Sequence, residues 1–270
     1  MQYDNIKRSL GNTFNSHPLL RIFFYKLLDI LLLRSWHIRR EIRHFKRESL
    51  KESKILDAGS GFGQYSYFLA KLSGTFSITA VDVKEDQITD CNTFFSKLGL
   101  DGRVHFQIAD LTTYSSENSF NLIISIDVME HIENDTAVFR NFYKNLKKGG
   151  WLLISTPSDQ GGSDVHDHGE HSFIEEHVRD GYNSSDISKK LKDAGFEKVE
   201  TRYSYGIPGQ ISWRLSMKYP MLMLGVSKFF FIILPFYYII TFPFCIILNY
   251  LDLFLHHPSG TGLIVKATKA

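Results

Sequence analysis

The sequence of 270 residues contains little cysteine and carries little net charge. Its two cysteines, Cys91 and Cys245, lie far apart, which argues against a disulfide scaffold and fits a reducing compartment. The net charge of +2 provides no strong global field to attract nucleic acid. The N-terminal apolar stretch lacks the pattern of a secretory signal, because Arg21, Lys26 and Asp29 interrupt it.

The charge that is present is uneven, and it helps to divide the chain into three zones. Residues 1–52 carry eleven Lys and Arg against five Asp and Glu, in two segments with helical spacing. Such helices suit a membrane surface with anionic headgroups, or they cover a protein core with their cations in water. We expect residues 53–206 and 260–270 to form one domain, and residues 207–259 to form a hydrophobic insertion.

The middle zone alternates short apolar runs with helical patterns. The predicted strands are Lys54–Ala58, Ile78–Asp82, Val104–Ile108, Leu122–Ile126, Trp151–Ser155, Val199–Tyr205 and, after the insertion, Gly262–Thr268. The predicted helices are Tyr65–Leu72, Glu85–Leu98, Asp135–Leu146 and Ser184–Ala194. This alternation predicts an α/β fold with a mostly parallel sheet covered by helices on both faces. Ligands bind such sheets at the carboxyl ends of the strands.

The segment KILDAGSGFGQYSYFLA, residues 54–70, places three glycines between a strand and a helix. Glycines at this point allow a tight turn and a close approach of the backbone to a ligand. Asp82 ends the next strand, where its carboxylate can accept from ribose hydroxyls, and Asp110 follows the third strand. The alternative is a plain tight turn followed by two aspartates that cap helices.

These motifs, with FNLIISIDVMEHI (120–132) and LKKGGWLLISTPS (146–158), resemble those of the class I S-adenosylmethionine-dependent methyltransferases. The resemblance implies a Rossmann-like seven-stranded sheet whose last strand is antiparallel and inserts beside the sixth. It also implies S-adenosylmethionine as the cofactor. The residues implied to bind it are Asp57, Gly59, Ser60, Gly61, Gly63, Asp82, Val83, Asp110, Leu111 and Asp127.

The insertion holds 23 successive residues without a charge, 229–251. Two membrane crossings would be tight in this length, and Pro235 and Pro243 interrupt helical runs. We therefore expect one or two short helices lying in one membrane leaflet, with tyrosines at the headgroup level. The alternatives are a buried helical cap and a homodimer interface.

Asp127-Val128-Met129-Glu130-His131 resembles the E-x-x-E-H motif of the ubiquinone-biosynthesis O-methyltransferases, where a divalent metal is associated with it. Asp127 replaces the first glutamate, so we expect no metal. His131 is predicted to be a base or a positioning residue, or else a structural group at a helix start.

The segment 161–182, which follows the fifth strand, is predicted to lie over the acceptor. His171 is its predicted catalytic residue, and Phe173 is expected to shape the acceptor pocket. Arg179 and Tyr182 are expected either to bind a polar headgroup or to cap the next helix.

The sequence thus predicts methyl transfer from S-adenosylmethionine to a lipophilic small-molecule acceptor. The expected place is the cytoplasmic face of a membrane, with the protein peripheral or monotopic. O-methylation of a quinone precursor or phenolic lipid ranks first. N-methylation of an amino-lipid headgroup is the alternative, and a non-catalytic membrane scaffold that retains the fold is a third reading. Nucleic acid is not an expected partner, since no basic patch with interleaved aromatics appears beyond the N-terminal segment.

Overall fold

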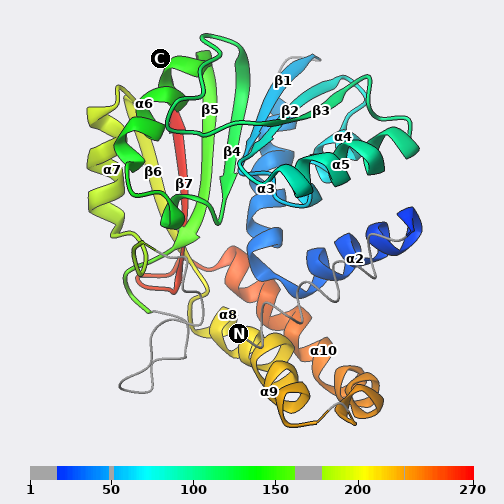
Figure 1. The fold of residues 1–270 in the computed structure, drawn as a ribbon. Helices are drawn as coiled ribbons and strands as arrows, with labels where there is room; N and C mark the ends of the chain where they lie inside the picture. The colour runs from blue at the N-terminus through cyan, green and yellow to red at the C-terminus, as the bar shows by residue number, and fades with distance from the viewer. Residues whose placement is uncertain (1–16, 49–51, 162–177, 228) are drawn as a thin grey trace.

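The computed structural model describes residues 17–48, 52–161, 178–227 and 229–270, and the strands of these ranges form one seven-stranded sheet (Figure 1). The strands are β1 (Ser53–Ala58), β2 (Phe76–Asp82), β3 (Val104–Ile108), β4 (Phe120–Ile126), β5 (Leu146–Pro157), β6 (Lys198–Ser204) and β7 (Gly262–Thr268). Their order is β3-β2-β1-β4-β5-β7-β6, with β7 antiparallel to both neighbours and the pairs from β3 to β5 parallel. The predicted sheet and the late antiparallel strand are therefore confirmed.

Helices cover both faces of the sheet, because successive strand residues point to opposite sides. Leu152 faces the core under α6 (Asp135–Asn145) and α7 (Ser184–Asp193). Its neighbour Leu153 faces α3 (Leu33–Glu48), α4 (Gln64–Leu72) and α5 (Glu85–Lys97). Ile123 and Ile124 divide in the same way. The continuous apolar runs of the sequence are thus buried from both sides.

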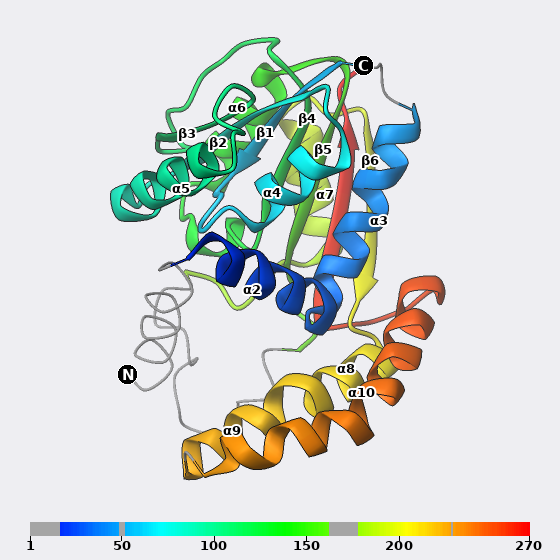
Figure 2. The same ribbon diagram turned by 90° about the vertical axis from the view of Figure 1, so that its right-hand side faces the viewer.

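The N-terminal zone forms two helices, α2 (Pro18–Leu31) and α3 (Leu33–Glu48). Helix α3 stands against one face of the sheet and buries Ile38, Ile42 and Phe45 in its core. Helix α2 crosses the edge at which the parallel strands end (Figure 2). The inner face of α3 therefore covers the protein core, which is one of the two interpretations of this zone. The outer face of α2 leaves apolar side chains such as Leu19 and Phe23 exposed.

The insertion is a helical hairpin that projects from the same edge of the sheet (Figure 1). One arm consists of α8 (Ile207–Trp213), η2 (Arg214–Lys218) and α9 (Tyr219–Val226), which follow each other without a break. The other arm is α10 (Phe230–Phe254), which runs antiparallel to the first. The hydroxyls of Tyr237 and Tyr238 donate to the carbonyls of Leu215 and Ser216 at 2.7 and 2.8 Å and tie the arms together.

One expectation for this segment was wrong, and one of the alternatives is excluded. Pro235 and Pro243 lie inside the single 25-residue helix α10 and do not end it. Each proline removes one backbone donor, but the neighbouring arm supports the helix from the side. The helix is also no buried cap, since only 6% of its most apolar window is buried. Among the described residues it is the one helix long and apolar enough to cross a membrane, judged by length and composition.

Candidate functional site

The glycine loop lies between β1 and α4, at the carboxyl edge of the sheet. Gly59, Gly61 and Gly63 have φ angles of +82°, +50° and +80°, which side chains disfavour. A Cβ atom at Gly59 would lie 2.3 Å from the side chain of Val128, which follows β4. The amides of Gly59 and Ser60 donate to the carbonyl of Val81 in β2 at 2.8 and 2.9 Å. The loop is therefore clamped between the ends of β2 and β4.

Three predicted aspartates stand at or after the ends of neighbouring strands. Asp57 is buried in β1 and accepts a hydrogen bond of 2.6 Å from the Ser66 hydroxyl. Burial raises the pKa of Asp57 to about 6, against the lowering effect of that hydrogen bond. Asp82 accepts from the Gly61 amide at 2.8 Å, so its carboxylate also fixes the loop. Asp110 is exposed and accepts from the amide and hydroxyl of Thr112 at 2.8 and 2.7 Å.

Neither Asp82 nor Asp110 is a helix cap. The N-cap position of α5 is Lys84, and Asp110 closes a turn on Thr112. Of the other predicted residues, Val83 is exposed at the rim and Leu111 is buried beneath it. These positions at the ends of β1, β2 and β3 lie together because parallel strands present their carboxyl ends at one edge.

Ser60 and Asp127 complete the predicted set. The Ser60 hydroxyl is buried, and no hydrogen-bond partner exists for it within the described ranges. Asp127 follows β4 with a φ of +52° and forms an ion pair with Arg34 of α3. Its backbone amide donates to the carbonyl of Ser155 in β5 at 2.8 Å.

Arg34 was not among the predicted site residues. Its backbone amide donates to the Tyr205 hydroxyl at 3.1 Å, and its guanidinium reaches Asp127. The sequence offers one sign of it, an isolated cation in the apolar run LLLRSW. Arg34 and Asp127 lie 93 positions apart in the sequence, and this separation concealed their contact.

Helix α2 also places two unpredicted residues on the loop. The Arg21 guanidinium is buried and donates to the Phe62 carbonyl and to Asp90, each at 2.7 Å. The Tyr25 hydroxyl donates to the same carbonyl, and burial raises the pKa of Tyr25. Gln64, at the start of α4, donates to Asp29 of α2 at 2.8 Å. The helix thus covers the loop from outside the sheet (Figure 2).

Of the two predicted catalytic histidines, only His131 lies among the described residues. His131 is half-buried in the short turn η1 (Met129–His131) after β4, beside buried Glu130. Burial raises the pKa of Glu130, whose carboxylate accepts from the Thr156 hydroxyl at 3.1 Å. His171 lies outside the described residues, as does Phe173.

Arg179 and Tyr182 bind each other and the start of α6. Arg179 pairs with Asp135, the first residue of that helix, and the Tyr182 hydroxyl contacts the same carboxylate at 2.8 Å. In this arrangement Arg179 and Tyr182 bind a carboxylate of the protein itself and not a headgroup. The helix that they contact is α6, which precedes them, and not α7, which they were expected to cap. Among the described residues, no group of three or more His, Cys, Asp and Glu is arranged to hold a metal ion.

Comparison with known proteins adds a family to this geometry. Residues 49–199, more than half of the chain, match the family described as "Methyltransferase domain". Phosphoethanolamine N-methyltransferase 1 of Arabidopsis thaliana is 34% identical over 157 residues, which cover 54% of this chain and 29% of that protein. The ubiquinone biosynthesis O-methyltransferase of Hydrogenovibrio crunogenus is 26% identical over 111 residues, 40% of this chain and 44% of that protein.

A solved structure shares the fold. Phosphoethanolamine N-methyltransferase 2 of Haemonchus contortus, in complex with S-adenosyl-L-methionine, superposes with a TM-score of 0.60 at 21% identity. The match covers 86% of this chain and 52% of that protein. The chain spans less than a third of the length of the plant relative and about half of the nematode protein.

Proposed function

Because the chain belongs to the methyltransferase-domain family, in the class I S-adenosylmethionine-dependent group, we propose that it methylates a lipophilic acceptor at a membrane surface. The observation that carries the proposal is the shared position of the glycine-loop site and the apolar hairpin. Both lie at the carboxyl edge of the sheet (Figures 1 and 2). An acceptor leaving the bilayer beside the hairpin would reach the glycine loop without crossing water.

The residues at this edge fit S-adenosylmethionine. The loop leaves space at Gly61, where an added Cβ would meet only the Gln87 side chain at 3.8 Å, and the unpartnered Ser60 hydroxyl offers a donor. Asp82 would accept from the ribose hydroxyls, and Asp110 would lie on the adenine side. Arg34 would meet the cofactor's carboxylate. When bound, the cofactor supplies an electrophilic methyl group on a sulfonium.

Of the two acceptor chemistries, an amine is the one we favour. The relatives with the higher identity carry the name phosphoethanolamine N-methyltransferase, which reverses the order in which the sequence alone ranks the two. A protonated amine must lose its proton before its lone pair attacks the methyl carbon, and we assign the removal of that proton to His131. The buried Glu130 beside it would stabilise the resulting imidazolium.

O-methylation of a phenolic lipid is the second candidate, supported by the resemblance to the ubiquinone biosynthesis O-methyltransferases. A phenol also needs a base, so His131 would have the same role. The two candidates differ in the atom that receives the methyl group, nitrogen or oxygen. The identity of the methylated product therefore distinguishes them.

The test incubates the full chain with labelled S-adenosylmethionine and a lipid extract of its native cells. We expect label in the organic phase, in a product whose mass identifies an amine, and about 100-fold less label with Asp82→Ala. Asp193→Ala, which removes an exposed carboxylate at the end of α7, is the matched control and should transfer normally. Label confined to the aqueous phase would contradict the lipophilic acceptor. A methylated phenol in the product would select the second candidate.

A further inference from the structure

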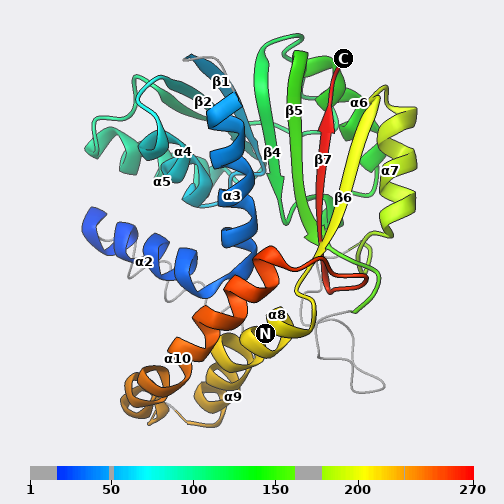
Figure 3. The same ribbon diagram turned by 180° about the vertical axis from the view of Figure 1, so that it is seen from behind.

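A groove of about 960 Å³ lies where α3, β6 and β7 meet the C-terminal end of α10. Figure 3 shows α10 reaching the base of α3 on this side of the sheet. Six cationic side chains line the groove, from Arg39, Arg40, Arg43, Arg47, Arg202 and Lys266. The carboxylates in its wall come from Asp29, Glu41 and Glu200. The groove therefore carries an excess of positive charge, and none of its lining residues belongs to the glycine loop.

Half of these cations are already paired. Arg39 binds Asp29 at 2.8 Å, Lys266 binds Glu200 at 3.4 Å, and Arg202 lies 3.8 Å from Glu41. Arg40, Arg43 and Arg47 form no ion pair with a carboxylate in the part of the chain that the structure describes, although the charge of Arg43 also acts on the nearby carboxylate of Asp29.

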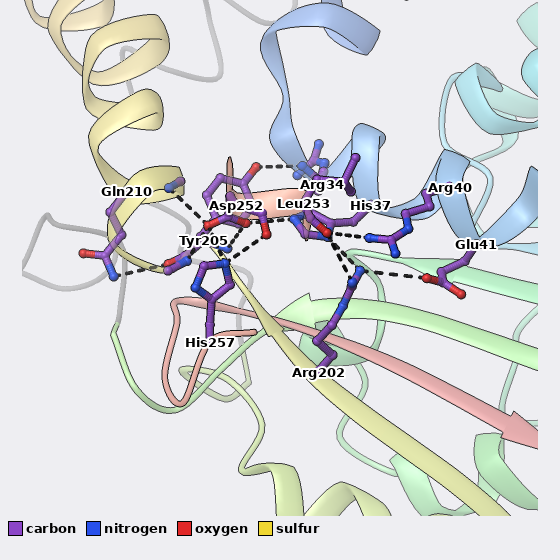
Figure 4. A network of polar contacts seen from close by, with 12 residues as sticks. Arg34, His37, Arg40, Glu41, Arg202, Tyr205, Gln210, Asp252, Leu253 and His257 are labelled. Carbon is purple, nitrogen blue, oxygen red and sulfur yellow. Dashed lines mark hydrogen bonds and ion pairs between the residues drawn. The ribbon is translucent and has the colours of Figure 1, made fainter. Parts of the chain in front are cut away.

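The three unpaired arginines lie on one helix and face one groove. Arg43 and Arg47 are exposed and one helical turn apart, so their guanidinium groups can act on one anion. Arg40 donates to the Leu253 carbonyl (Figure 4). It also lies over the Phe254 ring, with its Cζ 5.0 Å from the ring centroid. Cations placed in this way favour a phosphate, which guanidinium groups bind in a forked geometry.

The groove continues into a hollow with an almost wholly apolar lining. This second space of about 330 Å³ is lined by Ile247, Tyr250, Leu251 and Phe254 of α10, and by Leu255, which follows the helix. Tyr250 and Phe254 line both spaces, with their rings stacked at a centroid distance of 6.4 Å. A ligand that fills both must carry an anionic head and an apolar chain.

A buried polar network fixes the junction between α10 and the sheet (Figure 4). Asp252 accepts from the amides of Gly206 and Gly209 at 2.8 and 3.1 Å. Arg202 donates to Nδ1 of His37 at 2.9 Å, so Nε2 of that ring carries the proton that it donates to Asp252, also at 2.9 Å. The walls of the groove are thus held in place before any ligand arrives, which lowers the entropic cost of binding.

We propose that this groove binds the phosphate headgroup of an anionic phospholipid, with an acyl chain along Tyr250 and Phe254 toward Ile247. The inference rests on the proposed membrane placement, and it does not depend on which acceptor is methylated. It assigns the boundary between headgroups and acyl chains to the level of Trp36 and Tyr250, whose rings meet edge to face at 5.1 Å. Aromatic side chains of this kind favour that boundary.

The test measures flotation of the full chain with vesicles of phosphatidylcholine, with and without phosphatidylglycerol. We expect tighter binding when phosphatidylglycerol is present. The double variant R43Q/R47Q should lose about 25-fold in affinity for these vesicles, since each cation near an anionic surface contributes about fivefold. Its affinity for phosphatidylcholine alone should not change. K189Q/K192Q, which removes two exposed lysines of α7, is the control with the same loss of charge.

Three other outcomes would each contradict the phospholipid groove, the membrane placement or both. Equal binding of R43Q/R47Q and K189Q/K192Q to phosphatidylglycerol vesicles would overturn the groove and leave the membrane placement intact. Failure of the unaltered protein to float with either vesicle would overturn both, while methyl transfer in the lipid extract still tests the enzyme separately. Calorimetric binding of inorganic phosphate that R43Q/R47Q abolishes, with vesicle binding retained, would assign the groove to a soluble phosphate.

Discussion

The sheet and the hairpin use the same apolar side chains and place them in opposite surroundings. Ile123 and Ile124 of β4 are fully buried, whereas Phe236 and Ile239 of α10 are 67% and 71% exposed. The sheet has helices on both faces, so its apolar runs find protein on every side. Two helical arms cannot cover each other in this way. The sheet therefore supplies its own apolar environment, and the hairpin requires one from outside.

The largest expected effect is a loss of stability and cofactor binding at the glycine loop, with no effect on the hairpin. Gly59→Ala combines a left-handed φ with a Cβ placed 2.3 Å from Val128, and should cost about 4 kcal/mol of stability. It should also abolish measurable binding of S-adenosylmethionine. Gly99→Ala is the matched control, because its φ is +66° and nothing lies within 4 Å of its added Cβ.

Denaturant unfolding and calorimetry with the cofactor would measure these effects, and vesicle flotation should remain unchanged in both variants. If Gly59→Ala cost no more stability than Gly99→Ala, the close contact between the glycine loop and the end of β4 would not exist.

A charge on the hairpin should weaken vesicle binding and leave stability and cofactor binding unchanged. Ile239→Lys places an ammonium in the middle of α10 and should weaken vesicle binding by about 3 kcal/mol, the cost of a lysine near a bilayer centre. Unfolding and cofactor affinity should not change, because the side chain is 71% exposed. Ile239→Leu is the conservative control and should bind vesicles normally. Undiminished flotation of Ile239→Lys would mean that α10 meets water or a protein partner.

The smallest effect concerns the pH dependence of the sheet alone. The pKa of Asp57 rises on folding from its ordinary 3.8 to about 6, because the carboxyl is buried. The folded protein therefore keeps this proton at pH values where the unfolded chain has lost it. The stability that this group contributes is complete below pH 3.8, declines as pH rises, and is lost above about 6.

Asp57→Asn removes this titration and retains an acceptor for the Ser66 hydroxyl. We expect the variant to gain on the order of 2 kcal/mol relative to the unaltered protein across that pH window. Urea unfolding at pH 4, 5, 6 and 7 would measure the gain, with flotation unaffected. A constant stability difference between the two proteins would contradict the raised pKa.

The predicted strands were confirmed to within a few residues, and the boundaries of β3 and β7 were predicted without error. Strand β5 begins at Leu146 and not at Trp151, because it extends through the Gly149-Gly150 pair. Apolar runs bounded by turn residues depend on local chemistry, so a single sequence reveals them.

The candidate site could be predicted only in part. The glycine loop, Asp57, Asp82 and Asp110 follow strands in register and were found together as predicted. Arg21, Tyr25 and Arg34 come from helices that precede the sheet. Packing alone brings Arg21 and Tyr25 to the glycine loop and Arg34 to Asp127 after β4. No periodicity marks such residues, because their spacing reflects the face of their own helix and not the site that they cover.

The sequence by itself determined the positions of the strands along the chain, the carboxylates at their ends and the absence of charge over 229–251. Each of these depends on neighbours along the chain. Tertiary structure decided that both prolines stay within one helix and that its end meets α3. Arg40 and Leu253 touch across 213 positions of sequence. Such a contact exists only after the sheet has closed, since β7 must return past the hairpin to its place between β5 and β6.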